Sequence, residues 1–160
     1  MSGALQRLAD LVGVASGYTD AFGQAMERQR KAARAAEAGM AAGLEAAVPG
    51  NTENDVAAAI SAAMFRAGGE FPAVMPYVAS GPRTMIGHST WEGRTIEPGE
   101  HVFLEVGGCY RRYHAALMRT AVNGELSPTM YEAQERMKLA LAELKSLMRP
   151  GMTVSDADSL

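Results

Sequence analysis

Several kinds of residue are scarce in this sequence, and each scarcity excludes a class of protein. Of the 160 residues only Cys109 is a cysteine, so an internal disulfide is impossible. Aromatic residues make up 6% of the chain, and no apolar stretch is long enough to span a membrane. We therefore expect a protein of the reducing cytoplasm, and neither a disulfide-rich secreted protein nor a membrane protein.

Positive charge is scarce as well. The net charge is −3, the pI is near 5.6, and there is no run of basic residues. Nucleic acid and anionic membranes are therefore not expected partners, because both need a basic surface. Residues 1–7 lack the basic start and the apolar core of a signal peptide. What is present is a hydrophobic content of 48%, typical of a globular protein of single-domain size.

Helical patterns dominate both ends of the chain. We expect helices over about residues 3–14, 21–48, 53–67 and 127–148. Residues that favour helix are frequent there, and apolar residues recur with helical spacing. In the second helix, Gly39 and Gly43 either let another backbone approach closely or are simply tolerated. In the third helix, the residues expected to face inward are Val56, Ile60, Met64 and Phe65.

Strand patterns occupy the middle of the chain. Residues 71–80, which contain prolines, predict an irregular or edge strand. Residues 85–88 predict a short strand or a loop. Strands at about 101–107 and 110–122 form a predicted hairpin with Gly107-Gly108 as its turn. Helices and antiparallel strands together predict an α+β fold.

One acid, Glu105, interrupts the apolar run of the first hairpin strand. A buried strand disfavours a carboxylate unless the group is paired or has a chemical role. The residues alone leave three interpretations open: a structural acid neutralised by an arginine, a single metal ligand, or a nucleophile or base. The arginines near enough along the hairpin to neutralise it are Arg111, Arg112 and Arg119.

A short signature occurs twice. Pro49-Gly50 is followed by Thr52 and Asp55, and Pro150-Gly151 is followed at the same spacing by Thr153 and Asp156. A hydroxyl followed three residues later by an acid is a variant capping box, so each copy predicts the start of a helix. The repeat is either convergent capping or the mark of a pseudo-symmetric domain of two similar halves. On the second interpretation, the chain is expected to stop early in the second half.

A series of short motifs follows in a characteristic order. They are Pro49-Gly50 with Thr52-Glu53-Asn54-Asp55-Val56, Ser80-Gly81-Pro82 before Gly87-His88, Ile96-Glu97-Pro98-Gly99-Glu100, Glu105-Val106-Gly107, and Arg119-Thr120. With these motifs, residues 31–160 resemble the first part of the catalytic domain of the creatinase/aminopeptidase P/methionine aminopeptidase (M24) superfamily. The resemblance implies the pita-bread fold, with the first half complete and the second half truncated. Residues 1–30 lie outside it and are expected to form an N-terminal helical extension.

The resemblance also bears on metal binding. Metal-dependent members of the superfamily hold two ions with two aspartates on this hairpin and with a His and two Glu from the second half. Glu105 stands at the position of the first aspartate, and Ala116 stands at the position of the second. Alanine has no ligating atom. We therefore expect no metal and no other cofactor, the alternative being a pair of divalent ions, Mn or Zn.

Two branches of the superfamily work without metal, the creatine amidinohydrolases and the ectoine hydrolases. Residues 103–114, with residues 88–91 ahead of them, most resemble the ectoine-hydrolase branch. The resemblance implies that Glu105 attacks the amidine carbon of a cyclic substrate and opens the ring to an acetylated diaminobutyrate. It also implies that His88 shuttles protons. The alternative for His88 is a packed or surface histidine.

Three further residues are candidates for substrate binding. His114 binds a substrate carboxylate, orients Glu105 or simply packs. Trp91 is a candidate wall for an apolar ring face, and Tyr113 lies beside His114 on the second hairpin strand. Core packing is the alternative for both aromatic residues.

These observations support three functional hypotheses. The first is a cytoplasmic, metal-independent hydrolase of C–N bonds in a small amidine or cyclic compatible solute, working as a homodimer. The second is a metallopeptidase related to the Xaa-Pro aminopeptidases. The third is a non-catalytic fragment or binding module, because the resemblance places the rest of the cleft beyond Leu160.

Overall fold

The computed structural model describes residues 27–149 and 151–158. Residues Glu27–Glu125 form one compact unit, and the helices that follow belong to a second. In chain order the elements are α2 (Glu27–Ala46), α3 (Glu53–Arg66), β1 (Tyr77–Ser80), η1 (Gly81–Met85), β2 (His101–Tyr110), β3 (Tyr113–Val122), α4 (Pro128–Leu147) and α5 (Val154–Asp158). The helix expected over 3–14 lies outside the described residues. None of the described helices has the length and apolar character needed to cross a membrane.

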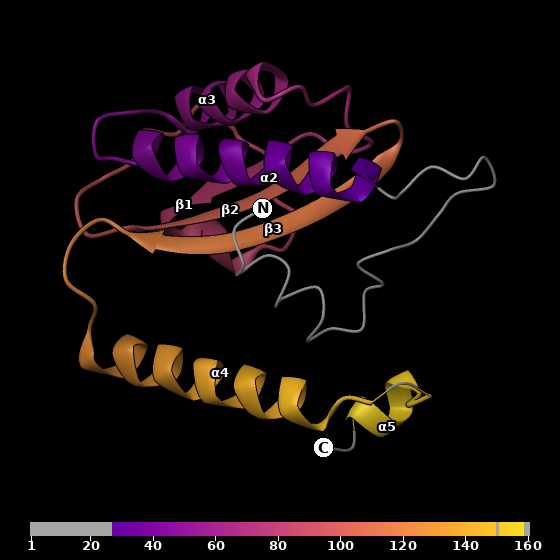
Figure 1. The fold of residues 1–160 in the computed structure, drawn as a ribbon. Coiled ribbons are helices and arrows are strands. Elements are labelled where there is room, and N and C mark those ends of the chain that lie inside the picture. The colour runs from indigo at the N-terminus through magenta and orange to yellow at the C-terminus, as the bar shows by residue number, and fades with distance from the viewer. Residues whose placement is uncertain (1–26, 150, 159–160) are drawn as a thin grey trace. The chain divides into compact units, whose positions relative to one another are not determined.

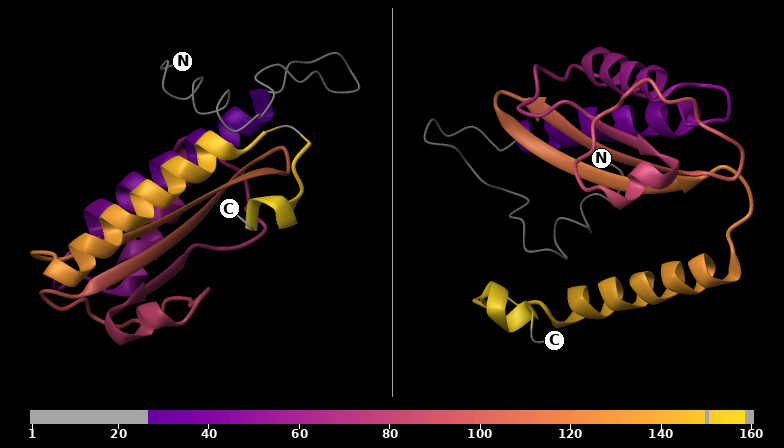
Figure 2. Two further views of the ribbon diagram at one scale, coloured as in Figure 1. Left: turned by 90° about the horizontal axis from the view of Figure 1, so that it is seen from below. Right: turned by 180° about the vertical axis from the view of Figure 1, so that it is seen from behind.

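The first unit has two layers. A three-stranded antiparallel sheet, in the order β1-β2-β3, carries α2 and α3 on one face (Figures 1 and 2). Side chains of β2 alternate between the two faces, as the pleat of a strand requires. The alternate residues Val102, Leu104 and Val106 are fully buried in the core with Met40 and Ile60 of the helices. The odd-numbered residues of β2, Glu105 among them, therefore face the side of the sheet without helices.

Two glycines of α2 let this helix lie close to α3. A Cβ atom added to Gly39 would lie 2.6 Å from Cγ of Met64, and one added to Gly43 would lie 2.7 Å from Cγ1 of Ile60. A real side chain needs more room than this, and a packed core yields it only at a cost. These glycines therefore have a packing role, but the close neighbours are side chains of the core and not the other backbone that the first interpretation expected.

The start of α3 confirms the predicted capping box. The Thr52 hydroxyl accepts a hydrogen bond from the Asp55 N–H at 3.2 Å, and the Asp55 carboxylate accepts one from the Thr52 N–H at 2.8 Å. The prediction that Phe65 faces inward is wrong, because this residue is 48% exposed. It follows the buried Met64 by about 100° around the helix axis, which takes it out of the buried stripe.

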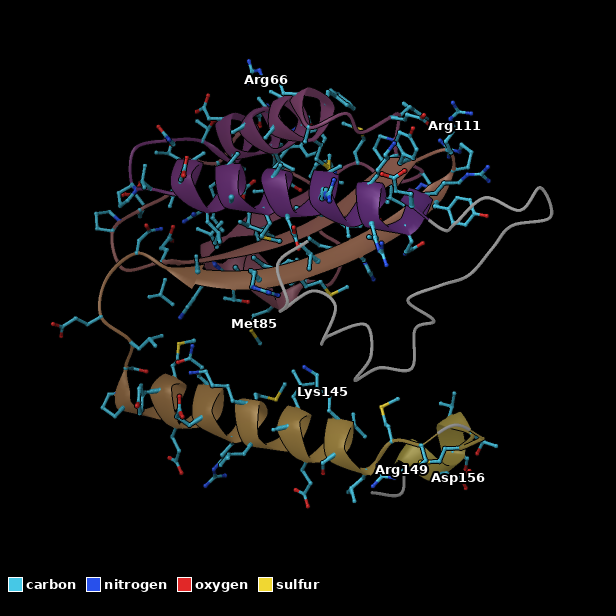
Figure 3. The ribbon with its side chains drawn as sticks, viewed as in Figure 1. Arg66, Met85, Arg111, Lys145, Arg149 and Asp156 are labelled. Carbon is cyan, nitrogen blue, oxygen red and sulfur yellow. The ribbon has the colours of Figure 1, made fainter. Side chains whose placement is uncertain are left out.

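The hairpin turn lies at Arg111-Arg112, and the predicted turn at Gly107-Gly108 is wrong. The two arginines have φ of 49° and 64°, as a two-residue type I′ turn requires, and Figure 3 shows Arg111 at the hairpin tip. Both glycines continue β2 instead. A Cβ atom on Gly108 would clash with the carbonyl oxygen of Ala32, so glycine here lets α2 pack directly on the strand.

The segment between α3 and the hairpin contains β1, η1 and the loop that carries His88. Among the described strands β1 pairs with β2 alone and is an edge strand, as predicted, but it covers only Tyr77–Ser80 of the predicted residues 71–80. Residues 81–85 form the short 3₁₀ helix η1, so residues 85–88 are the end of this turn and a loop, and not a strand. Met85 projects on the face of the sheet opposite α2 and α3 (Figure 3).

The second unit repeats the capping chemistry of the first. Ser127 caps α4, and its hydroxyl accepts a hydrogen bond from the Met130 N–H. At the start of α5, the Thr153 hydroxyl accepts from the Asp156 N–H at 3.2 Å, and the Asp156 carboxylate accepts from the Thr153 N–H at 2.8 Å. These distances equal those at the start of α3. Both copies of the repeated signature are therefore capping boxes.

Candidate functional site

A cavity of about 270 Å³ opens on the face of the sheet opposite the helices. β2 and β3 form its floor, and its walls come from the segment before β1 and the loop after η1. Most of the lining is apolar, with residues such as Ala73, Val74 and Met75. The carboxylate and the imidazoles in this lining belong to Glu105, His88 and His114. The cavity thus collects three of the five predicted site residues.

Glu105 projects into this cavity from the middle of β2. Its Cα partners are Tyr77 on β1 and Met118 on β3, so the carboxylate stands over the centre of the sheet. Its side chain is 15% exposed, and Oε2 lies 3.1 Å from Nδ1 of His88. Among the described residues, His88 is the one polar partner of this carboxylate. The rest of the group faces the cavity, free to contact a ligand.

His88 is held in an unusual backbone conformation. Its φ is 55°, in the left-handed region that residues other than glycine seldom adopt. The ring meets the ring of Tyr77 edge-on, with centroids 5.0 Å apart, and the side chain is 67% exposed. Because Nδ1 faces Glu105, Nε2 on the far side of the ring is available to a second proton partner.

The arginines that the sequence offered as counter-ions do not neutralise Glu105. The Arg111 N–H donates to the Glu70 carboxylate, and the Arg112 guanidinium donates to the carbonyl oxygen of Phe71. Arg119 pairs with Leu104 across the sheet, and opposite residues share a face. Arg119 therefore stands on the other face from Glu105. The interpretation of Glu105 as an arginine-paired structural acid loses its support.

His114 forms part of the cavity wall, and a hydrogen bond orients its ring. Its Nε2 accepts a hydrogen bond from the Ala73 N–H at 3.1 Å. A ring nitrogen that accepts carries no proton, so the proton of the neutral imidazole resides on Nδ1. A doubly protonated His114 would lose the bond to Ala73. This geometry fixes the ring beside the cavity and agrees with a binding or orienting role better than with proton shuttling.

Trp91 and Tyr113 lie away from the cavity. Trp91 packs against the hydrophobic core of the first unit. Tyr113 neighbours His114 on β3, and successive side chains of a strand point to opposite faces. Tyr113 accordingly stands on the helix side, where the Arg28 guanidinium lies 5.7 Å from the centre of its ring. Neither residue belongs to the cavity lining in the part of the chain that the structure describes.

Ala116 lines the cavity close to Glu105. It pairs with Gly107, two residues beyond Glu105 on the same face of the sheet. The diagonal neighbour of a cavity-facing residue is within reach of a long side chain. A carboxylate at position 116 would therefore share the cavity with Glu105, whereas the alanine present adds only a methyl group.

Two charged residues near the cavity escaped the sequence analysis. Glu53 is fully buried, although an acid in the first turn of a helix normally faces solvent. Its Oε2 lies 2.5 Å from Nη1 of Arg83, which also donates to the loop that carries His88. No periodicity or motif indicated this pair, because its members stand on separate elements thirty residues apart.

A second ion pair lies close by but does not reach that loop. The Arg94 guanidinium donates to both carboxylate oxygens of Glu100 and to the hydroxyl of Ser80. The hydrogen bond from Arg94 holds the pKa of Glu100 below its usual range. The same bond raises the pKa of Arg94.

Comparison with known proteins places the chain in a family. Residues 27–160 match the metallopeptidase family M24, and the chain belongs to this family. It is 31% identical over 130 residues to an Xaa-Pro dipeptidase from Pyrococcus furiosus, an alignment that covers 81% of this chain and 37% of the relative. It is 29% identical over 89 residues to an ectoine hydrolase from Halomonas elongata, covering 56% of this chain and 22% of the relative.

Solved structures agree with this placement. The prolidase from Pyrococcus furiosus superposes with a TM-score of 0.79 at 28% identity, covering 96% of this chain and 44% of the prolidase. An Xaa-Pro dipeptidase from Bacillus anthracis gives 0.76 at 25% identity, covering 94% and 42%. The fold is thus the α+β pita-bread fold, as predicted. The chain spans less than half the length of these relatives.

The residues present do not fit the metal pair that the family name implies. In residues 27–149 and 151–158, no group of three or more His, Cys, Asp or Glu is arranged to hold a metal ion. Glu105 and His88 are neighbouring donors, but Ala116 contributes none and His114 already uses Nε2 to accept from Ala73. The described part of the chain therefore supplies two donors and not the ligand set of a metal pair.

Proposed function

We propose that the protein is a metal-independent hydrolase that opens a C–N bond in a small cationic amidine, of the ectoine-hydrolase type. One observation carries the proposal. The carboxylate of Glu105 faces a small cavity with a single histidine at 3.1 Å, and Ala116, at the position that the family resemblance assigns to a second metal-binding acid, adds only a methyl group to the lining. A carboxylate that is not paired with an arginine attracts a cationic amidinium group.

The proposed chemistry needs two steps. An oxygen of Glu105 adds to the amidinium carbon, and the electrons of the C=N bond move to nitrogen. Protonated His88 gives its proton to one of the two nitrogens, and the C–N bond to that nitrogen breaks. The intermediate is an O-acyl imidate, in which the former amidine carbon is bonded to Glu105 through oxygen and keeps the other nitrogen. Water attacks this carbon, with neutral His88 accepting a proton from the water, and the bond to the Glu105 oxygen breaks. This releases the amide product and restores the carboxylate.

The shape of the cavity supports a small substrate. Its volume of about 270 Å³ is near the lower end of the usual range for ligand sites. The methyl groups of Ala73 and Ala116 offer contact to an apolar ring face. His114, fixed by its bond to Ala73, presents an imidazole to a polar substituent such as a substrate carboxylate. These contacts would position the amidine carbon beside Glu105.

Exchange of Glu105 for Gln tests the nucleophile. The amide keeps the shape but removes the charge and the nucleophilic oxygen, so ring opening should fall by about 10³-fold or more while substrate still binds. Glu97→Gln is the matched control, since Glu97 is an exposed acid outside the cavity. Retention of turnover in Glu105→Gln would show that this residue is not the nucleophile.

A second candidate function rests on the relatives. The Xaa-Pro dipeptidase from Pyrococcus furiosus aligns over more of the chain than the ectoine hydrolase does, which favours a metal-dependent peptidase of that type. The metal content of the purified protein separates the candidates. Two equivalents of a divalent ion, together with loss of activity on chelation, would favour the peptidase. Activity that persists in metal-free protein would favour the amidine hydrolase.

The proposal also covers the cellular compartment and the oligomeric state. We propose that it acts in the cytoplasm as a homodimer on a small molecule. The sole cysteine is buried in β2, which suits a reducing compartment. Light scattering of the purified protein measures the oligomeric state, and a monomer at micromolar concentration would exclude the dimer.

A further inference from the structure

The buried carboxylate of Glu53 receives four hydrogen bonds. Oε1 accepts from the N–H and the hydroxyl of Ser80 at 2.8 and 2.9 Å. Oε2 accepts from the Glu92 N–H at 2.9 Å and from Nη1 of Arg83 at 2.5 Å. A fully buried acid with this many donors is a fixed anchor. The anchor ties the end of β1 to the segment after His88.

Arg83 extends this anchor into the loop that carries His88. Its Nη2 donates to the hydroxyl of Ser89 at 3.1 Å and to the carbonyl oxygen of Thr90 at 2.6 Å, and it lies 3.0 Å from the carboxylate of Glu92. One planar guanidinium therefore joins Glu53 to three of the four residues that follow His88, namely Ser89, Thr90 and Glu92. The Arg83 side chain is only 16% exposed, although its partner Glu92 is 67% exposed.

The loop needs such an anchor because His88 is strained. Its φ of 55° lies in the left-handed region, which is unfavourable for a residue other than glycine. A Cβ added to Gly87 ahead of it would meet no atom within 4 Å, so this residue lies in open space. The residues after His88 are the ones that the Arg83 guanidinium bonds.

We propose that the Glu53–Arg83 pair is the positioning device of the site, which fixes the loop after His88 and so holds the His88 ring against Glu105 and Tyr77. This rests on the proposed function only for its catalytic consequence. The geometric claim, that Arg83 determines where the His88 ring lies, stands without any assumption about the reaction.

Arg83→Lys tests the proposal with little risk to folding. A lysine keeps a positive charge beside buried Glu53, but a single nitrogen cannot also bond Ser89 and Thr90. Arg94→Lys is the matched control, because Arg94 lies in the same region, donates to Glu100 and Ser80, and makes no bond to residues 88–92. Ser89→Ala is a milder second variant that removes one of the Arg83 bonds.

The first readout is the NMR cross-peak between the ring protons of His88 and Tyr77, whose rings touch edge-on. The chain has three histidines, so their ring signals can be resolved. The cross-peak should vanish in Arg83→Lys, weaken in Ser89→Ala and persist in Arg94→Lys. A cross-peak that persists in Arg83→Lys, or that vanishes equally in Arg94→Lys, would overturn the proposal.

The second readout is turnover of the amidine. If His88 acts as proposed, Arg83→Lys lowers kcat about ten- to a hundredfold with little change in KM, because the proton donor is displaced and the substrate site is not. Loss of the cross-peak with unchanged kcat would uphold the positioning role and instead contradict the role of His88 in the proposed reaction. The two failures are thereby distinguished.

Discussion

Glu53 and Glu105 are two acids of the same unit that the fold treats in opposite ways. Glu53 is fully buried and receives four hydrogen bonds, one of them from an arginine. Glu105 is 15% exposed, faces a cavity and has one histidine as its partner. Every acceptor position of the first carboxylate is used, while most of the second remains open. The difference teaches that the number of bonded donors, more than burial, separates an anchoring acid from one available for chemistry.

The largest expected effect is on stability, from Glu53→Gln. An amide at this position leaves Arg83 without its charged partner and turns an N–H group toward the donors of Ser80. Breaking a buried ion pair from one side costs about 3–5 kcal/mol. Glu105→Gln should cost less than about 1 kcal/mol, because its contact with His88 is partly exposed. Urea denaturation of both variants measures the contrast, and equal losses would refute the distinction between the two acids.

The next effect comes from adding a second acid beside Glu105. Ala116→Asp should create a site for Mn²⁺ or Zn²⁺, because two carboxylates and a histidine would then share the cavity. Without metal, the two like charges should lower stability by about 1–2 kcal/mol. Titration calorimetry with MnCl₂ measures the gain, with wild type and the double variant Glu105→Gln/Ala116→Asp as controls. If Ala116→Asp binds no more metal than wild type, position 116 is not a missing ligand.

A smaller effect is expected from the capping box that Thr52 forms with the exposed acid Asp55. Thr52→Ala removes the hydroxyl half of the capping box at the start of α3 and should lower stability by about 1 kcal/mol. Thr153→Ala removes the same bond at α5, in the second unit. Because α5 does not belong to the core of the first unit, that variant should leave the unfolding transition of Glu27–Glu125 unchanged. Thermal unfolding followed by circular dichroism compares them, and identical losses would mean that the two units unfold together.

The smallest effect concerns pH and a third acid, Glu100. The hydrogen bond from Arg94 holds the pKa of Glu100 below its ordinary value of 4.5. The folded chain therefore binds this proton more weakly than the unfolded chain does, so the pair stabilises the fold above pH 4.5 and this contribution disappears as pH falls through the lowered pKa. The stability of Glu100→Gln should change less than that of wild type between pH 5 and pH 3. If the free energy of unfolding of both proteins changes equally between pH 5 and pH 3, Glu100 is not the source of this pH dependence.

Local signals in the sequence predicted much of the fold. Both capping boxes were predicted from a Thr followed three residues later by an Asp. The edge position of β1 was predicted from the prolines near it. The turn of the hairpin could not be predicted in the same way. Gly107-Gly108 is the stronger turn signal, but Gly108 is needed where α2 crosses the strand, a contact that only the tertiary structure creates. The actual turn uses two arginines at positive φ.

The site was predictable only where the strand pattern and the family resemblance agreed. Glu105 is conspicuous as the one acid in an apolar run, and His88 lies in a motif of the superfamily. Tyr113 illustrates the limit, because alternation along β3 puts it and His114 on opposite faces and the sequence does not say which face is open. Glu53 resembles an ordinary first-turn acid, so neither its burial nor its pairing with Arg83 could be foreseen.

The central claim is that Glu105 forms a bond to the substrate. Rapid acid quenching of the enzyme during turnover of the amidine, followed by trypsin digestion, isolates residues 95–111, which also contain Glu97 and Glu100 as internal controls. Fragmentation by mass spectrometry then locates any added mass. We predict an adduct on Glu105 and on neither control. Turnover without an adduct, or an adduct on Glu97 or Glu100, would contradict the account.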